Sequence, residues 1–180
     1  MGRSQQMTVQ KTSKDALAQM FRDSMRLVAS SVSLVTARDY AGNWHGMAVT
    51  SAGSLSLDPP SMMVAINRTS SIHPVILASG YFTLNLMDES QADMLEPFTR
   101  SDMRDRRFVD EAWVPAGLSG PVLMGALCSH ICKVAEAHDF GTHTVFFGTI
   151  DDVILDESAS EGPILWLNGK RRSIAAMQPV

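Results

Sequence analysis

The sequence has few cysteines, no strong excess of charge and no long apolar run. Two cysteines among 180 residues exclude a disulfide framework, and one Cys pair does not make a zinc site. A net charge of −4 and a pI near 5.7 give no support for a nucleic acid or an anionic membrane as partner. Apolar runs such as 62–66 are too short to cross a bilayer. Residues 1–7 lack the apolar segment of a secretory signal. Since the two cysteines suggest no disulfide framework, we expect a reducing cytoplasm.

Common catalytic motifs are also missing. The sequence contains no Gly-x-Gly-x-x-Gly after a predicted strand, no Gly-x-Ser-x-Gly and no His-Glu-x-x-His, which removes the usual signals of a Rossmann site, a hydrolase elbow and a zinc protease. Of the five histidines, only His138 and His143 approach metal-like spacing, across a predicted turn. We predict no metal site.

Hydrophobic residues make up 45% of the chain and charged residues 19%, as in a globular protein of one domain. We expect a flexible tail at 1–12 and a single domain at 13–180. Apolar residues recur at helical spacing from Leu17 through Phe21 to Val28, and Ser13 is a suitable N-cap. This pattern predicts an amphipathic helix packed against the core.

Several segments have the composition of β-strands. The predicted strands are 31–37, 44–50, 61–66, 81–86, 128–135, 143–150 and a final one at 164–167. Turns are predicted at 39–43, 137–141 and 168–170, and an acidic loop is predicted at 152–161. The continuous apolar run 61–66 predicts a strand that is buried on both faces. A short helix should end at Gly80, and the charged segment 98–107 should be mobile and solvated. Strands in hairpin order with few helices indicate a mainly β, antiparallel barrel.

The stretch 46–60 begins as a strand and then continues in small and hydroxyl-bearing residues until Asp58-Pro59-Pro60 ends it. Its hydroxyl groups suit an acceptor-rich ligand. On this stretch alone, a serine-rich connection between strands is the favoured interpretation.

A second candidate lies just before the short helix. Ser70 or Ser71 stands where a helix N-cap belongs, Pro74 suits the first turn, and Arg68 adds a positive charge. These residues fit an anion site at a helix start, and they fit equally well a capped helix beside a solvated arginine.

Taken together, the motifs resemble a known family. They are Gly46-Met47 with Thr50-Ser51, the segment 54–60, Asn67 to Ser71 with His73, and the block 141–148 that begins Gly-Thr-His-Thr. Over residues 20–172 the chain resembles the short-chain flavin reductases, the reductase components of two-component flavin monooxygenases. This resemblance implies a Greek-key split β-barrel of the FMN-binding type with peripheral helices.

The resemblance also implies roles for individual residues. The isoalloxazine ring would be lined by Met47, Ala48, Val49 and Thr50. The ribityl and phosphate end would be held by Ser51, Ala52, Asn67, Arg68, Ser70 and Ser71. Asn85 and Phe98 would complete the pocket wall, and His143 would face the nicotinamide. Thr142 departs from the Asp that many relatives carry beside this histidine.

The implied activity is NAD(P)H:flavin oxidoreductase, in which hydride passes from NADH or NADPH to FMN or FAD. Reduced flavin would diffuse to a separate oxygenase, and the pocket would lie at a homodimer interface. Orientation of two rings needs no acid–base pair, which agrees with the missing motifs. Two alternatives remain: a flavin-binding electron carrier or sensor without turnover, and a split-barrel module for a different ligand.

Overall fold

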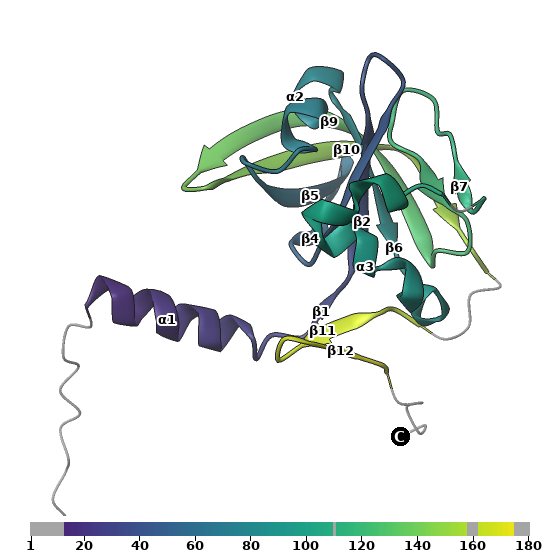
Figure 1. Cartoon of the computed structure of the whole chain (residues 1–180). Helices are drawn as coiled ribbons and strands as arrows, with labels where there is room; N and C mark the ends of the chain where they lie inside the picture. The colour runs from purple at the N-terminus through teal and green to yellow at the C-terminus, as the bar shows by residue number, and fades with distance from the viewer. Residues whose placement is uncertain (1–12, 110, 158–161, 175–180) are drawn as a thin grey trace, which may run out of the picture.

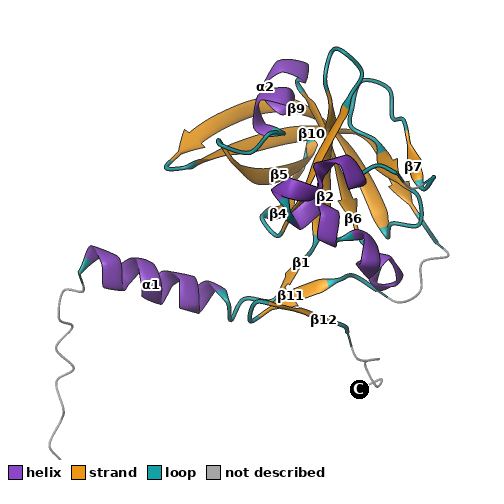
Figure 2. Cartoon of the chain, in the orientation of Figure 1, coloured by secondary structure: helices purple, strands orange, loops and turns teal. Residues whose placement is uncertain are grey.

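The computed structural model describes residues 13–109, 111–157 and 162–174, so the predicted tail at 1–12 lies outside the described residues. Seven antiparallel strands form the main sheet in the order β3-β2-β6-β9-β10-β5-β4 (Figures 1 and 2). The strands are β2 (Ser33–Arg38), β3 (Trp44–Val49), β4 (Ala52–Leu57), β5 (Pro60–Asn67), β6 (Tyr81–Leu86), β9 (Cys128–Phe140) and β10 (His143–Leu155). The predicted fold class, mainly β and antiparallel with peripheral helices, is confirmed.

The two outermost strands of this sheet, β3 and β4, follow one another in the chain. Thr50 and Ser51 join them, and no strand ladder pairs β3 with β4 in the part of the chain that the structure describes. The curled sheet therefore stays open along a seam between its edges, as a split barrel does.

The remaining elements are short. A three-stranded sheet contains β1 (Ser30–Ser31), β11 (Leu165–Leu167) and β12 (Lys170–Arg172), and β7 (Trp113–Val114) pairs with β8 (Val122–Leu123). The helices are α1 (Lys14–Met25), α2 (His73–Ser79) and α3 (Glu96–Thr99), with 3₁₀ helices η1 (Glu89–Met94) and η2 (Ser101–Arg106). Within the described ranges, no helix is long and apolar enough to cross a membrane.

The core forms two clusters, and β2 contributes to both because its side chains alternate between faces. Val35 packs with Phe82 and Phe146 in one cluster, and Leu34 packs with other residues in the second. Cys132 lies in the first cluster, where burial raises the pKa of its thiol to about 12. Cys132 thus behaves as a small buried apolar residue.

Several element boundaries differ from the predictions. β9 ends at residue 140 and β10 begins at residue 143, so the turn between them is only Gly141-Thr142. Residues 152–155 belong to β10 and not to a loop. Gly141 has a φ of 58°, which allows this tight turn. The predicted burial of both faces of β5 is wrong, since Met63 is 37% exposed. The predicted last strand at 164–167 is followed by one more strand, β12.

Helix α1 is capped as predicted, because Ser13 Oγ accepts a hydrogen bond from the Ala16 N–H. Its predicted packing against the core is wrong. The helix projects away from the sheet (Figure 1), and Leu17, Met20 and Phe21 are 58%, 60% and 62% exposed. An amphipathic pattern shows that one face needs a cover, but it does not say which surface provides it.

The charged segment 98–107 is folded, and its prediction as a solvated stretch fails at Arg107. This guanidinium is buried and donates to the carbonyl oxygens of Pro97 and Arg100 at 2.8 Å each and to that of Gly46 on β3. These bonds hold α3 and η2 against β3. Alternating charges indicate a polar surface, but they do not reveal which arginine turns inward.

Replacing Arg107 should therefore destabilise the fold. We expect Arg107→Met to lower the free energy of unfolding by about 2–4 kcal/mol, because three carbonyls lose a charged donor at a buried site. Arg106→Met is the matched control, since Arg106 is exposed, and its effect should stay within about 0.5 kcal/mol. Urea denaturation of both variants checks this. If Arg107→Met and Arg106→Met have equal free energies of unfolding, the Arg107 hydrogen bonds contribute nothing to the stability of the fold.

Candidate functional site

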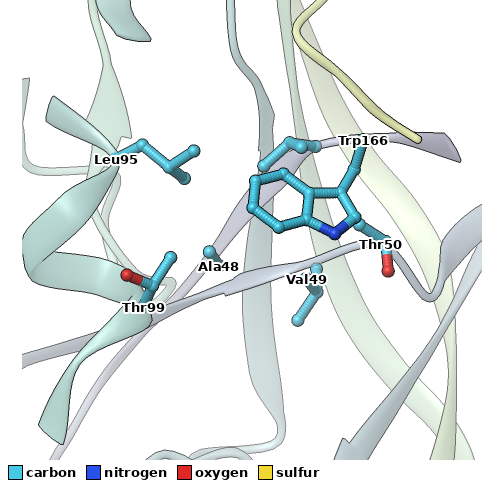
Figure 3. Close-up of a pocket in the computed structure, with 7 residues that line it drawn as sticks. Ala48, Val49, Thr50, Leu95, Thr99 and Trp166 are labelled. Atoms are coloured by element: carbon cyan, nitrogen blue, oxygen red, sulfur yellow. The ribbon is translucent and has the colours of Figure 1, made fainter. Parts of the chain in front are cut away.

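A groove runs beside the seam of the sheet and consists of two adjoining hollows. The first has a volume of about 160 Å³ and is lined by Val32, Ala48, Val49, Thr50, Leu95, Thr99 and Trp166 (Figure 3). Its walls come from the end of β3, from η1–α3 and from β11. Most of these side chains are apolar, so this hollow suits a flat, largely apolar group.

The second hollow, of about 230 Å³, shares Thr99 with the first. Its lining includes Met47, Ser70, Ser71, Phe98, Arg100, Arg104 and Arg107. One end of the groove is therefore apolar, and the other carries hydroxyl groups and arginines.

The arginines of the second hollow differ in how they are paired. Arg100 binds Asp102 at 2.7 Å and Glu96 at 3.4 Å, and its hydrogen bond to Asp102 raises the pKa of Arg100. Arg104 has no carboxylate within ion-pair distance among the described residues. Burial, with a smaller effect of the nearby Arg104 charge, lowers the pKa of Arg107. An anion bound here would offset this repulsion.

The segment 67–71 supplies Thr69, Ser70 and Ser71 to the lining of the second hollow. Asn67 Oδ1 accepts hydrogen bonds from the Thr69 N–H and hydroxyl, both at 2.9 Å, and Ser70 Oγ donates to the Asn67 carbonyl at 2.7 Å. The predicted N-cap at Ser70 or Ser71 is wrong. Helix α2 begins at His73 after Ile72, with no side-chain cap, because a turn closed by the His73 N–H and the Ser70 carbonyl precedes it.

Arg68 points elsewhere. Its Nη2 donates to the Gly141 carbonyl at 2.7 Å, and its Nη1 lies 3.4 Å from Asp139. The structure thus places Arg68 at the tip of the β9–β10 hairpin, and it is not part of the lining of the second hollow. At the seam, Ser51 Oγ donates to the Ala65 carbonyl at 2.8 Å, and Ala52 begins β4.

His143 is the exposed first residue of β10, opposite Asn67 in the register with β5. Its Nδ1 lies 2.9 Å from Thr142 Oγ1, so a threonine hydroxyl contacts this histidine. The next residue anchors the hairpin tip: Thr144 Oγ1 lies 2.8 Å from His73 Nε2 and donates to Asp139. That bond is the main cause of the lowered pKa of Asp139.

Asn85 is fully buried and does not line the groove. Its Nδ2 donates to the Leu34 carbonyl at 3.2 Å, and its Oδ1 accepts from the Leu123 N–H at 2.9 Å and from Ser129 Oγ at 2.7 Å. The expectation that it completes the pocket wall is replaced by a structural role, in which one amide joins β6 to its neighbours. Alternation along a strand assigns Asn85 to one face of the sheet, but it does not say whether a ligand or another segment covers that face.

Sequence reasoning missed Leu95, Thr99, Arg100, Arg104 and Trp166 as groove residues. They come from residues 95–104 and from the last hairpin, where the sequence carries no motif. Their approach to β3 depends on tertiary packing.

Comparison with known proteins gives the family. The model of the flavin reductase like domain matches residues 25–175. The chain is 34% identical over 139 residues, 76% of this chain and 81% of the relative, to the 4-hydroxyphenylacetate 3-monooxygenase reductase component of Salmonella typhi. It is 32% identical to the FMN reductase (NADH) RutF 2 of Methylorubrum extorquens, covering 74% and 77% of the two chains. Nitrilotriacetate monooxygenase component B from Mycobacterium thermoresistibile superposes with a TM-score of 0.83 at 27% identity, covering 93% of each chain.

Fold and relatives together define the class of protein as an oxidoreductase built on an antiparallel split sheet. Within that class, the chain belongs to the flavin reductase-like family.

Proposed function

We propose that this protein is an NAD(P)H-dependent flavin reductase that transfers hydride from a nicotinamide to FMN or FAD and supplies reduced flavin to a separate monooxygenase. Relatives named as reductase components and as FMN reductases support this proposal. The observation that carries it is the groove with one apolar and one basic end, which matches a flat ring joined to a phosphate.

The residues present fit a flavin. Ala48, Val49 and Thr50 line the apolar hollow and would hold the ring. Ser70 and Arg104, at the basic end, would hold the phosphate through charge-assisted hydrogen bonds. A flavin held there would supply N5 as the acceptor for the hydride of nicotinamide C4. The groove residues bind and orient the two rings, which accounts for much of a rate enhancement of this kind.

His143 is proposed to contact the nicotinamide. It lies at the end of β10, where the Arg68–Gly141 and Thr144–Asp139 hydrogen bonds fix the hairpin tip. An imidazole held this way can donate to the carboxamide or to a phosphate oxygen of the dinucleotide.

We also propose a homodimer. The exposed apolar stripe of α1, which includes Leu17, Met20 and Phe21, would be covered by a second copy, since amphipathic helices gain stability by burying such a face. A cytoplasmic location stays a prediction.

Rapid anaerobic mixing tests the activity and the role of His143 together. Wild-type protein should oxidise NADH or NADPH and reduce FMN or FAD. His143→Ala should slow flavin reduction about 10- to 100-fold through lost orientation, with flavin affinity unchanged. His138→Ala, an exposed residue of the same hairpin, should behave as wild type.

Other outcomes of this experiment decide against parts of the proposal. A flavin that survives gel filtration without nicotinamide oxidation would support the carrier or sensor alternative. Protein that neither binds nor reduces flavin would point to a different ligand. An unchanged reduction rate in His143→Ala at every nicotinamide concentration would make His143 a structural residue.

The phosphate end is tested by comparing FMN with riboflavin, which has the same ring without a phosphate. Arg104→Ala should weaken FMN binding by about 1–3 kcal/mol and leave riboflavin binding unchanged. Arg106→Ala is the control, as a neighbouring exposed arginine. Fluorescence titration measures both ligands. Equal losses for FMN and riboflavin would contradict the assignment.

The same titration decides the role of Arg68. A loss confined to FMN in Arg68→Ala supports a phosphate contact, as the family resemblance implies. Equal or absent losses assign Arg68 to the hairpin tip alone.

The dimer is tested by sedimentation at micromolar concentration. Wild-type protein should have about twice the chain mass of 19.6 kDa. Phe21→Asp should shift the population to monomer, because it places a charge within the apolar stripe. Gln19→Glu, a charge added two residues away, should leave the mass unchanged. A wild-type mass near that of one chain would rule out the dimer.

A further inference from the structure

Trp166 occupies an unusual place. It is the middle residue of the three-residue strand β11, in the small sheet separate from the seven-stranded one. Its side chain lines the apolar hollow together with Ala48, Val49 and Thr50. Figure 3 shows the indole ring projecting toward the end of β3, with Leu95 and Thr99 on the other side of the hollow.

Core packing does not account for this side chain. Trp166 is 39% exposed, whereas Trp113 is buried within an aromatic cluster with Phe98 and Phe108. Among the described residues, the Trp166 indole N–H has no hydrogen-bond acceptor. A large aromatic ring with one face toward a hollow and an unused donor is suited to a ligand that is flat and carries acceptors.

The backbone around Trp166 is fixed from several sides. It pairs with Ser30 of β1 and with Arg171 of β12. Just before it, the Val32 N–H donates to the Ile164 carbonyl at 2.9 Å, and the Ile164 N–H donates to the Met87 carbonyl at 3.2 Å. β11 is therefore tied to the main sheet next to the groove, and the backbone that carries the indole is held in position before any ligand arrives.

We infer that Trp166 forms the aromatic wall of the flavin-ring pocket and stacks on the isoalloxazine ring, which makes the β11–β12 hairpin part of the cofactor site. This inference rests on the proposed function. It assigns Trp166 to the ring and not to the phosphate, since the arginines and the serines lie in the other hollow. Loss of the indole should therefore affect every ligand with this ring alike, whatever its tail.

Fluorescence titration with riboflavin and FMN tests the inference on the full-length protein. Trp166→Leu should weaken both ligands by the same factor, about tenfold, as expected for loss of one stacking partner. Flavin fluorescence should be quenched less in the complex of Trp166→Leu than in the complex of the wild-type protein. Trp166→Phe should keep most of the affinity, because a ring remains, but it should lose part of the quenching.

Trp44→Phe is the matched control. Trp44 is the first residue of β3, packs against Phe108 at 5.7 Å between ring centroids and does not line the apolar hollow. Its variant should bind and quench both flavins as wild type does.

The possible results separate the inference from the proposed function. Wild-type protein that binds neither flavin overturns both. Flavin binding with unchanged affinity and quenching in Trp166→Leu overturns the inference alone, as does a change only in sedimentation mass, which would make Trp166 a subunit contact. If Trp166→Leu does not fold, Trp166→Phe decides: unchanged quenching overturns the inference, and reduced quenching at near wild-type affinity supports it.

Discussion

The buried guanidinium of Arg107 is the constraint on which the groove depends. By donating to carbonyls of β3, α3 and the start of η2, it brings a strongly charged segment against the edge of the sheet. Gly46 makes this approach possible, since a Cβ there would lie 2.9 Å from the Phe98 ring. Thr99 and Arg104 are carried along with that segment and form one wall of the groove. A surface of charged residues thereby becomes part of a binding site.

The groove combines segments that are distant in the sequence, among them the end of β3, the loop before α2, the α3–η2 segment and β11. The end of β3 contributes mainly apolar surface, and the loop before α2 contributes hydroxyl groups. The α3–η2 segment contributes positive charge together with Phe98 and Thr99, and β11 contributes an aromatic ring. None of them supplies a nucleophile or a paired acid and base. This division agrees with a reaction in which cofactors carry the chemistry and the protein supplies orientation.

Much of the fold follows from the sequence. Strand β6 and the β2–β3 hairpin appear where alternation and turn residues predict them, because local pattern decides such elements. The site is only partly predictable. Met47 to Thr50 are indicated as site residues only by the resemblance to the flavin reductases, since the stretch alone favours a serine-rich connection. The burial of Arg107, the interior place of Asn85 and the approach of Trp166 depend on contacts between distant segments and leave no signal in the sequence. Likewise, the pattern of α1 predicts its helix and its cap but not the surface that covers it.

The seam between β3 and β4 has a mechanical consequence. Its two edges are joined by peptide bonds through Thr50 and Ser51 instead of by a ladder of hydrogen bonds. Three Cα–Cα steps separate Val49 from Ala52, so these ends can move apart by no more than about 10 Å. A ligand that enters beside the seam breaks no pairing between β3 and β4, and the covalent link keeps the two edges from separating at this end. The sheet thus has an open edge whose two sides are covalently joined at one end. A flat ligand would enter and leave beside this edge while every strand pairing of the sheet stays intact.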